Sequence, residues 1–95
     1  MRPSDGYITY IINPKSGASS RKLACRQFHR YLVSHGYDVR AYSTVSLKHA
    51  RELATRAAAD EACMLVVAAG GDGTIRESAH GLEGSDTALL VVPCG

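Results

Sequence analysis

Two short segments have the composition of phosphate-binding loops. One is Gly70-Gly71-Asp72-Gly73-Thr74 and the other is Asn13-Pro14-Lys15-Ser16-Gly17. Glycine lacks the Cβ atom that would keep a polyphosphate away from the backbone, and it permits positive φ, so that consecutive N–H groups can face one ligand. A helix beginning directly after such a loop adds the partial positive charge of its N–H groups. The two segments therefore predict a site for a phosphate-bearing ligand.

A carboxylate inside the first segment points to a metal ion. Asp72 would repel phosphate unless a cation or a hydroxyl donor lies beside it, and a divalent ion such as Mg²⁺, bound directly or through water, would remove that conflict. Thr74 supplies a hydroxyl at the same place. The cysteines and histidines show no metal-ligand spacing, so Asp72 is the expected metal contact.

Each segment also has a purely structural interpretation. Asp72-Gly73 is a common turn pair, and Thr74 followed by Glu77 matches a capping box at a helix start. Asn13-Pro14 is a common turn pair too, and Lys15 could point to water. Three glycines exceed what a cap requires, and a helix rather than a second hairpin strand follows them, which favours phosphate binding. The spacing excludes a P-loop and a dinucleotide-binding fingerprint.

The hydrophobic pattern predicts strands that alternate with helices. Strands are expected at 7–12, 37–42, 63–68 and 88–92, and helices from Ser19 or Ser20 to 35, at 46–60 and at 74–81. This βαβαβαβ order predicts an α/β fold with one parallel sheet between helices. Because ligands bind beyond the carboxyl ends of parallel strands, we expect sheet order 2-1-3-4, which places both loops at one crevice.

Helical spacing predicts which side chains face the sheet. In the first helix these are Ala24, Phe28, Tyr31 and Leu32, and Gly36 is expected to end it. In the second they are Leu47, Ala50, Leu53, Ala54 and Ala57.

Composition narrows the class of protein. The formal net charge is +2, which demands no nucleic-acid partner. No apolar run approaches the ~20 residues that span a bilayer, and no secretion signal is recognisable. Three cysteines, an odd number widely spaced, predict reduced thiols in a cytoplasmic protein.

Charge is uneven along the chain, since residues 1–40 carry seven basic and two acidic side chains. That excess, mostly at Arg21, Lys22, Arg26 and Arg30, indicates either a solvated helix face or a positive field beside an anionic ligand or membrane.

Taken together, the two segments resemble the diacylglycerol kinase catalytic domain, a lipid-kinase family that includes sphingosine and ceramide kinases. The resemblance runs from Tyr7 to Gly95 and implies that this part binds ATP with Mg²⁺ near Asp72. Thr44, after the second strand, matches a family threonine of the nucleotide site, although it could equally cap the next helix. The implied ATP contacts are Asn13, Ser16, Gly17, Thr44, Gly70, Gly71, Asp72, Gly73, Thr74 and Glu77.

The same resemblance implies a phosphotransferase that moves the γ-phosphoryl group of ATP to a lipid hydroxyl such as that of diacylglycerol. Residues 1–95 would be the nucleotide-binding fragment, inactive alone, with the general base and a second domain outside them. Of the family's Pro-x-Gly-Thr-x-Asn-Asp segment only Pro93 and Gly95 are present, and Arg76 stands where many bacterial members have Asn. Peripheral membrane contact is expected, and self-association is left open. The alternatives are an NAD kinase, a non-catalytic nucleotide-binding module, or a fragment that binds nothing.

Overall fold

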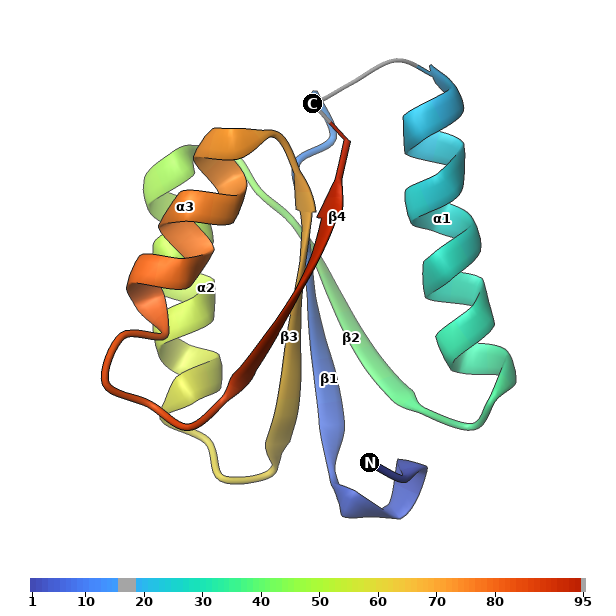
Figure 1. The fold of residues 1–95 in the computed structure, drawn as a ribbon, viewed down its shortest axis with the longest axis vertical. Helices are drawn as coiled ribbons and strands as arrows, with labels where there is room; N and C mark the ends of the chain where they lie inside the picture. Colours follow the sequence, from blue (N-terminus) through green and yellow to red (C-terminus); the bar gives the residue numbers. More distant parts are fainter. Residues whose placement is uncertain (16–18, 95) are drawn as a thin grey trace.

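One four-stranded parallel sheet forms the centre of the molecule (Figure 1). The computed structural model describes residues 1–15 and 19–94, and for 19–22 the backbone alone. A short 3₁₀ turn, Pro3–Asp5, precedes the first strand. The strands are β1 Tyr7–Ile12, β2 Asp38–Ser43, β3 Cys63–Gly70 and β4 Ala88–Pro93, and the helices are α1 Ser19–Ser34, α2 Leu47–Ala58 and α3 Asp72–Gly81.

The sheet order is β2-β1-β3-β4, which confirms the α/β fold and the order expected from the sequence. β1 pairs in parallel with both β2 and β3, so the strand order reverses between β1 and β3. Ile12, the last residue of β1, lies opposite Ala69, the residue before the end of β3. The chain segments that follow β1 and β3 therefore leave the sheet side by side.

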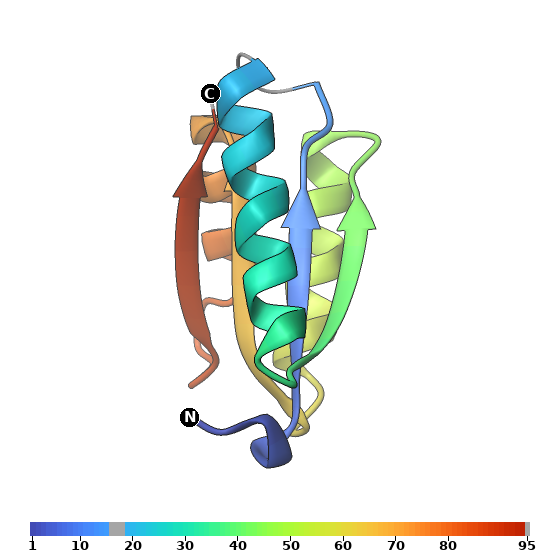
Figure 2. The same ribbon diagram turned by 90° about the vertical axis from the view of Figure 1, so that its right-hand side faces the viewer.

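The two faces of the sheet are covered unequally. α1 crosses one face alone, while α2 and α3 lie together on the other (Figure 2). β3 is buried on both faces over almost its whole length, as its continuous apolar run predicted. Four of the five side chains expected to face inward from α2 are buried, whereas Leu47 is 50% exposed. No helix in the described part of the chain is long and apolar enough to cross a bilayer.

The inward face of α1 agrees with the prediction at Phe28 and Leu32 and differs at Ala24 and Tyr31. Ala24 and Tyr31 are exposed, whereas Cys25 and Leu32 are buried and Phe28 is partly buried. The buried stripe is turned toward His29, whose ring stacks on Tyr10 of β1 with centroids 5.2 Å apart. Hydrophobicity alone places Tyr31 inside, but the partly polar His29 occupies that side of the helix. The expected helix end at Gly36 is confirmed, because Gly36 has a φ of 87°.

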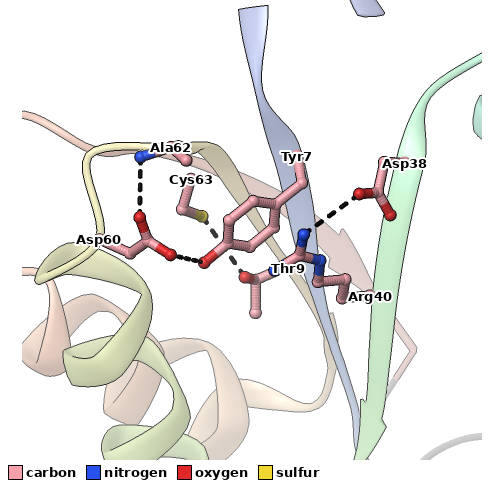
Figure 3. A network of polar contacts seen from close by, with 7 residues as sticks. All are labelled: Tyr7, Thr9, Asp38, Arg40, Asp60, Ala62 and Cys63. Atoms are coloured by element: carbon pink, nitrogen blue, oxygen red, sulfur yellow. Dashed lines mark hydrogen bonds and ion pairs between the residues drawn. The ribbon is translucent and has the colours of Figure 1, made fainter.

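Polar groups join three parts of the chain at the amino end of the sheet (Figure 3). The Tyr7 hydroxyl donates to Asp60 Oδ2 at 2.7 Å, and the Ala62 N–H donates to Oδ1 at 2.9 Å. The Arg40 guanidinium lies 3.7 Å from the Tyr7 ring centroid and pairs with Asp38 at 3.3 Å. The hydrogen bond to Asp60, with burial second, raises the pKa of Tyr7 to about 12, and the same bond lowers the pKa of Asp60.

Candidate functional site

The two predicted loops meet at the carboxyl edge of the sheet. Asn13 follows β1 directly, and its N–H donates to the carbonyl of Ala69 in β3 at 3.0 Å. Its side-chain Nδ2 donates to Thr74 Oγ1 in the first turn of α3 at 3.4 Å. One side chain therefore joins both segments, so they lie next to each other at this edge of the sheet, and a shared ligand crevice stays a prediction.

The first loop bends sharply at Asn13. Its side-chain Oδ1 accepts a hydrogen bond from the N–H of Lys15 at 3.0 Å, which is an Asx-type turn around the exposed Pro14. The Lys15 side chain is exposed at the same edge. Ser16 and Gly17, both expected to contact the nucleotide, lie outside the described residues.

The glycines of the second segment act through close packing. Gly70, Gly71 and Gly73 all have negative φ, so the expectation that positive φ turns their N–H groups toward a ligand is wrong. A Cβ atom on Gly70 would lie 2.8 Å from Cβ of Thr74, and one on Gly73 would lie 3.0 Å from Cδ2 of Leu47. The missing side chains let the start of α3 approach both β3 and α2.

α3 begins two residues earlier than the sequence predicted. Gly71 is its N-cap and Asp72 its first residue. Thr74 is 2% exposed and lies inside the first turn, so the capping-box interpretation of Thr74 and Glu77 is wrong. Helix geometry leaves the N–H groups of this turn without intrahelical partners, and the helix dipole adds partial positive charge. The start of α3 is thus suited to an anion even though its glycines have ordinary φ values.

Asp72 is the carboxylate that the sequence assigned to a metal ion, and this contact stays a prediction. Its side chain is exposed at the start of α3. The described residues hold no group of three or more His, Cys, Asp or Glu side chains arranged around a common point. Mg²⁺ commonly binds through one or two carboxylates together with substrate phosphates and water. The residues therefore suit that arrangement, and they do not suit a metal cage made by protein ligands alone.

Glu77 lies one turn further along α3 and pairs with α2. Its Oε2 accepts a hydrogen bond from Nη2 of Arg51 at 3.0 Å. This bond lowers the pKa of Glu77. The geometry gives Glu77 a role in joining the two helices, and a contact with nucleotide stays a prediction.

Thr44 and Asn13 border the same hollow. The Thr44 N–H donates to the carbonyl of Ile12 at 2.8 Å, which holds the end of β2 beside the end of β1. Its helix-capping interpretation is wrong, because Ser46 caps α2 by accepting from the His49 N–H at 3.1 Å. The hollow has a volume of about 470 Å³, and its lining residues are Asn13, Pro14, Lys15, Ser43, Thr44, Val45, Ser46 and Leu47.

A second hollow of about 290 Å³ lies on the α1 side of Asn13 and Pro14. Two of its lining residues, Cys25 of α1 and Cys94 after β4, form a disulfide bond, so the expectation of reduced thiols is wrong for this pair. Their separation of 69 residues hid the pairing in the sequence. Cys25 is on the inward face of α1 and Cys94 follows β4 at the same sheet edge, so the fold brings them together. Cys63 is free.

Comparison with known proteins identifies the family. The sequence profile of the diacylglycerol kinase catalytic domain matches residues 7–95. The chain belongs to the diacylglycerol kinase catalytic domain family. Within this family, the diacylglycerol kinase of Bacillus subtilis (strain 168) is 37% identical over 87 residues, which are 90% of this chain and 28% of that protein. The chain thus spans less than a third of that relative's length.

Solved structures share the fold of this family member. A putative diacylglycerol kinase from Bacillus anthracis str. Sterne superposes with a TM-score of 0.79 at 24% identity, covering 94% of this chain and 32% of that one. A second structure of a diacylglycerol kinase from the same organism gives a TM-score of 0.71 at 23% identity, covering 94% and 33%. These likenesses support the parallel α/β architecture.

Proposed function

We propose that this chain supplies the nucleotide-binding part of an ATP-dependent lipid kinase. Membership of the diacylglycerol kinase catalytic domain family supports the kinase class. The observation that carries the nucleotide site is the Asn13–Thr74 contact, which joins the loop after β1 to the start of α3. A polyphosphate lying along this edge can reach the Asn13 amide, the Lys15 ammonium and the first N–H groups of α3 together.

The residues of this edge position the polyphosphate and offset its charge. Phosphoryl transfer depends mainly on positioning and electrostatic stabilisation. The N–H groups of α3 and Lys15 carry positive charge, and Mg²⁺ held between Asp72 and the phosphates would supply further charge neutralisation. The γ-phosphoryl group would pass to a lipid hydroxyl, with diacylglycerol as the proposed acceptor. We place the general base outside residues 1–95, so this chain alone is proposed to be inactive.

Calorimetry with Mg-ADP on the natural full-length protein tests the site. Asn13→Ala and Asp72→Ala are each expected to weaken binding about tenfold or more, since hydrogen bonds and ion contacts to charged groups are worth roughly 1.5–3 kcal/mol. Asp86→Ala is the matched control, because Asp86 is an exposed carboxylate in the loop before β4, at the opposite sheet edge. Equal affinity in all four proteins, or no binding by any of them, contradicts the proposal.

Labelled ATP identifies the acceptor. The full-length protein is incubated with diacylglycerol in mixed micelles and, separately, with NAD. Label in the lipid supports the proposed activity, whereas label in NAD supports an NAD kinase. Nucleotide binding without transfer to either acceptor identifies a non-catalytic module.

Peripheral membrane contact through α1 is part of the same proposal. α1 contains four Arg or Lys residues and no Asp or Glu, and Arg26 and Arg30 are exposed. None of the ion pairs found among described residues involves this helix. Exposed Leu23 and Val33 lie on the same side of α1 and add apolar surface. A basic surface with apolar side chains suits an anionic bilayer.

Vesicle sedimentation tests this contact. Arg26→Gln with Arg30→Gln is expected to release the full-length protein from phosphatidylserine-containing vesicles, while vesicles of phosphatidylcholine alone bind neither form. Arg56→Gln, at an exposed arginine of α2, is the matched control and should bind like the parent. Unchanged sedimentation of the double variant would contradict the membrane contact and would mean that the basic side chains of α1 only face solvent.

A further inference from the structure

We propose that Cys25 and Cys94 are a reversible thiol–disulfide pair, open to small disulfide oxidants such as glutathione disulfide, whose oxidation fixes the wall of the nucleotide site. The two residues are bonded, and both line the 290 Å³ hollow beside Asn13. The part of this proposal that concerns nucleotide affinity rests on the proposed function. The existence of the redox pair does not.

The bond connects α1 to both candidate phosphate loops. The Cys94 N–H donates to the carbonyl of Gly70 at 2.8 Å, at the point where β3 leads into α3. Asn13 lines the same hollow as the two sulfur-bearing side chains and contacts Thr74. A movement of Cys94 or of the first half of α1 therefore acts directly on residues that border the site.

Among the side chains that the structure describes, which in α1 begin at Leu23, few contacts other than the disulfide hold this end of the helix. It lies alone on its face of the sheet, whereas α2 and α3 support each other (Figure 2). Next to the disulfide, the carbonyl of Cys25 accepts a hydrogen bond from the Tyr10 hydroxyl at 2.7 Å. Without the covalent bond, the described contacts that remain near the wall of the hollow are this hydrogen bond, the packing of partly buried Phe28 and the stacking of His29 on Tyr10.

This pair differs from the third cysteine in its bonded partner and its charged neighbour and not in burial, since Cys25, Cys94 and Cys63 are 4%, 3% and 5% exposed. Arg26 lines the same hollow, and a nearby cation favours the thiolate, which is the form that attacks a disulfide. Cys63 lies at the amino end of the sheet, where its sulfur contacts Thr9 Oγ1 at 3.4 Å, and it has no disulfide partner. In reducing compartments of the cell, disulfides that do form are usually transient and redox-sensing or catalytic.

The exchange is balanced without any further reactant. One cysteine thiolate attacks a sulfur of glutathione disulfide, which gives a mixed disulfide and releases one glutathione. The second cysteine thiolate then attacks the mixed disulfide, which forms the Cys25–Cys94 bond and releases the second glutathione. The two cysteines lose two electrons and two protons, and the oxidant takes up both. Excess glutathione reverses the sequence.

The oxidised protein is expected to bind nucleotide more tightly. A wall held in one position loses less conformational freedom when ligand binds, and pre-organisation of this kind raises affinity. We expect reduction to weaken Mg-ADP binding about three- to tenfold.

The test uses the natural full-length protein in glutathione buffers of graded composition. Free thiols are alkylated, peptides are mapped without reduction, and Mg-ADP affinity is measured in each buffer. The parent and Cys63→Ser should show the Cys25–Cys94 peptide in oxidising buffer and the three- to tenfold change. Cys25→Ser and Cys94→Ser should bind like the reduced parent in every buffer.

Alkylation of both Cys25 and Cys94 in oxidising buffer overturns the redox pair. A mapped bond with unchanged Mg-ADP affinity overturns its control of the site. If no redox state binds Mg-ADP, the proposed function fails, and with it the control of affinity. The peptide map alone then decides whether the pair exists.

Discussion

Thr74 occupies the space that a side chain on Gly70 would need. Alanine at residue 70 would bring a Cβ within 2.8 Å of Cβ and 2.9 Å of Oγ1 of a threonine that is 2% exposed. We expect Gly70→Ala to lower the free energy of unfolding by about 1–3 kcal/mol, the usual cost of overpacking, and to break the Asn13–Thr74 contact. Urea unfolding measures the first effect, and Mg-ADP calorimetry measures the second.

Gly73→Ala is the matched control for this prediction. Its Cβ would meet the far end of Leu47, a flexible and half-exposed side chain that can move aside. Alanine is also favoured over glycine in a helical turn. If Gly70→Ala and Gly73→Ala destabilise the protein equally, the close contact with Thr74 is not the reason that residue 70 is glycine.

Tyr7 and Tyr10 should make the protein sensitive to alkaline pH. The hydrogen bond to Asp60 raises the pKa of Tyr7, and burial raises that of Tyr10, both from 10.0 to about 12. The folded state therefore favours the protonated phenols, so their contribution is complete below pH 10 and is lost between pH 10 and 12. Tyr7→Phe should make the fall in unfolding free energy over this interval less steep.

Tyr31→Phe serves as the control, because Tyr31 is 55% exposed on α1. It should leave the pH dependence of unfolding as in the parent. An equally steep fall in Tyr7→Phe and in the parent would mean that Tyr7 does not contribute.

The sequence predicted that these residues lie together, but it could not predict how they are packed. Glycine, a carboxylate and a hydroxyl in one short segment pointed to an anion site, and Asn13 and Thr74 do meet. The use of Gly70 depends on a side chain four residues away, and that of Gly73 depends on Leu47 in another helix. Neither neighbour can be recognised from the glycines themselves, so positive φ was the wrong explanation.

At the level of elements, Gly81 sets how closely α3 approaches α2. A Cβ there would lie 2.6 Å from both Cβ of Ala54 and the carbonyl oxygen of Arg51, and a backbone atom cannot rotate away. Gly81→Ala should lower the free energy of unfolding by about 1–3 kcal/mol, measured by urea unfolding. Ala79→Ser, at an exposed position of α3, should change it by less than about 0.5 kcal/mol, and a similar loss in both would refute the packing argument.

The order of elements was predictable because alternating strands and helices allow few topologies. Apolar spacing also identified the inward face of α2, where small and branched apolar residues alternate clearly with charged ones. For α1 it was right for Phe28 and Leu32 but wrong for Ala24 and Tyr31. The error at Tyr31 arises because His29 and Tyr31 each combine apolar and polar character. Only the Tyr10 ring, which lies beneath His29, decides between them.

For the molecule as a whole, the Cys25–Cys94 bond closes a loop across a sequence separation of 69 residues. In the loop-entropy description, a cross-link of that span lowers the entropy of the unfolded chain and thereby stabilises the folded state by about 4 kcal/mol. Reductant should therefore lower the urea midpoint of the parent and of Cys63→Ser. Cys25→Ser should already show the lower midpoint, and reductant should not move it further. A midpoint unaffected by reductant in the parent would contradict this prediction.

Two separate sets of polar residues lie at the two ends of the sheet. Asn13, Thr44 and Thr74 stand where the strands finish, whereas the bonds among Tyr7, Asp60 and Arg40 stand where they start. No residue belongs to both sets. Under the proposed function, substitutions that change ligand specificity can therefore accumulate at one end without weakening the polar contacts at the other, so that specificity can diverge while the fold is kept.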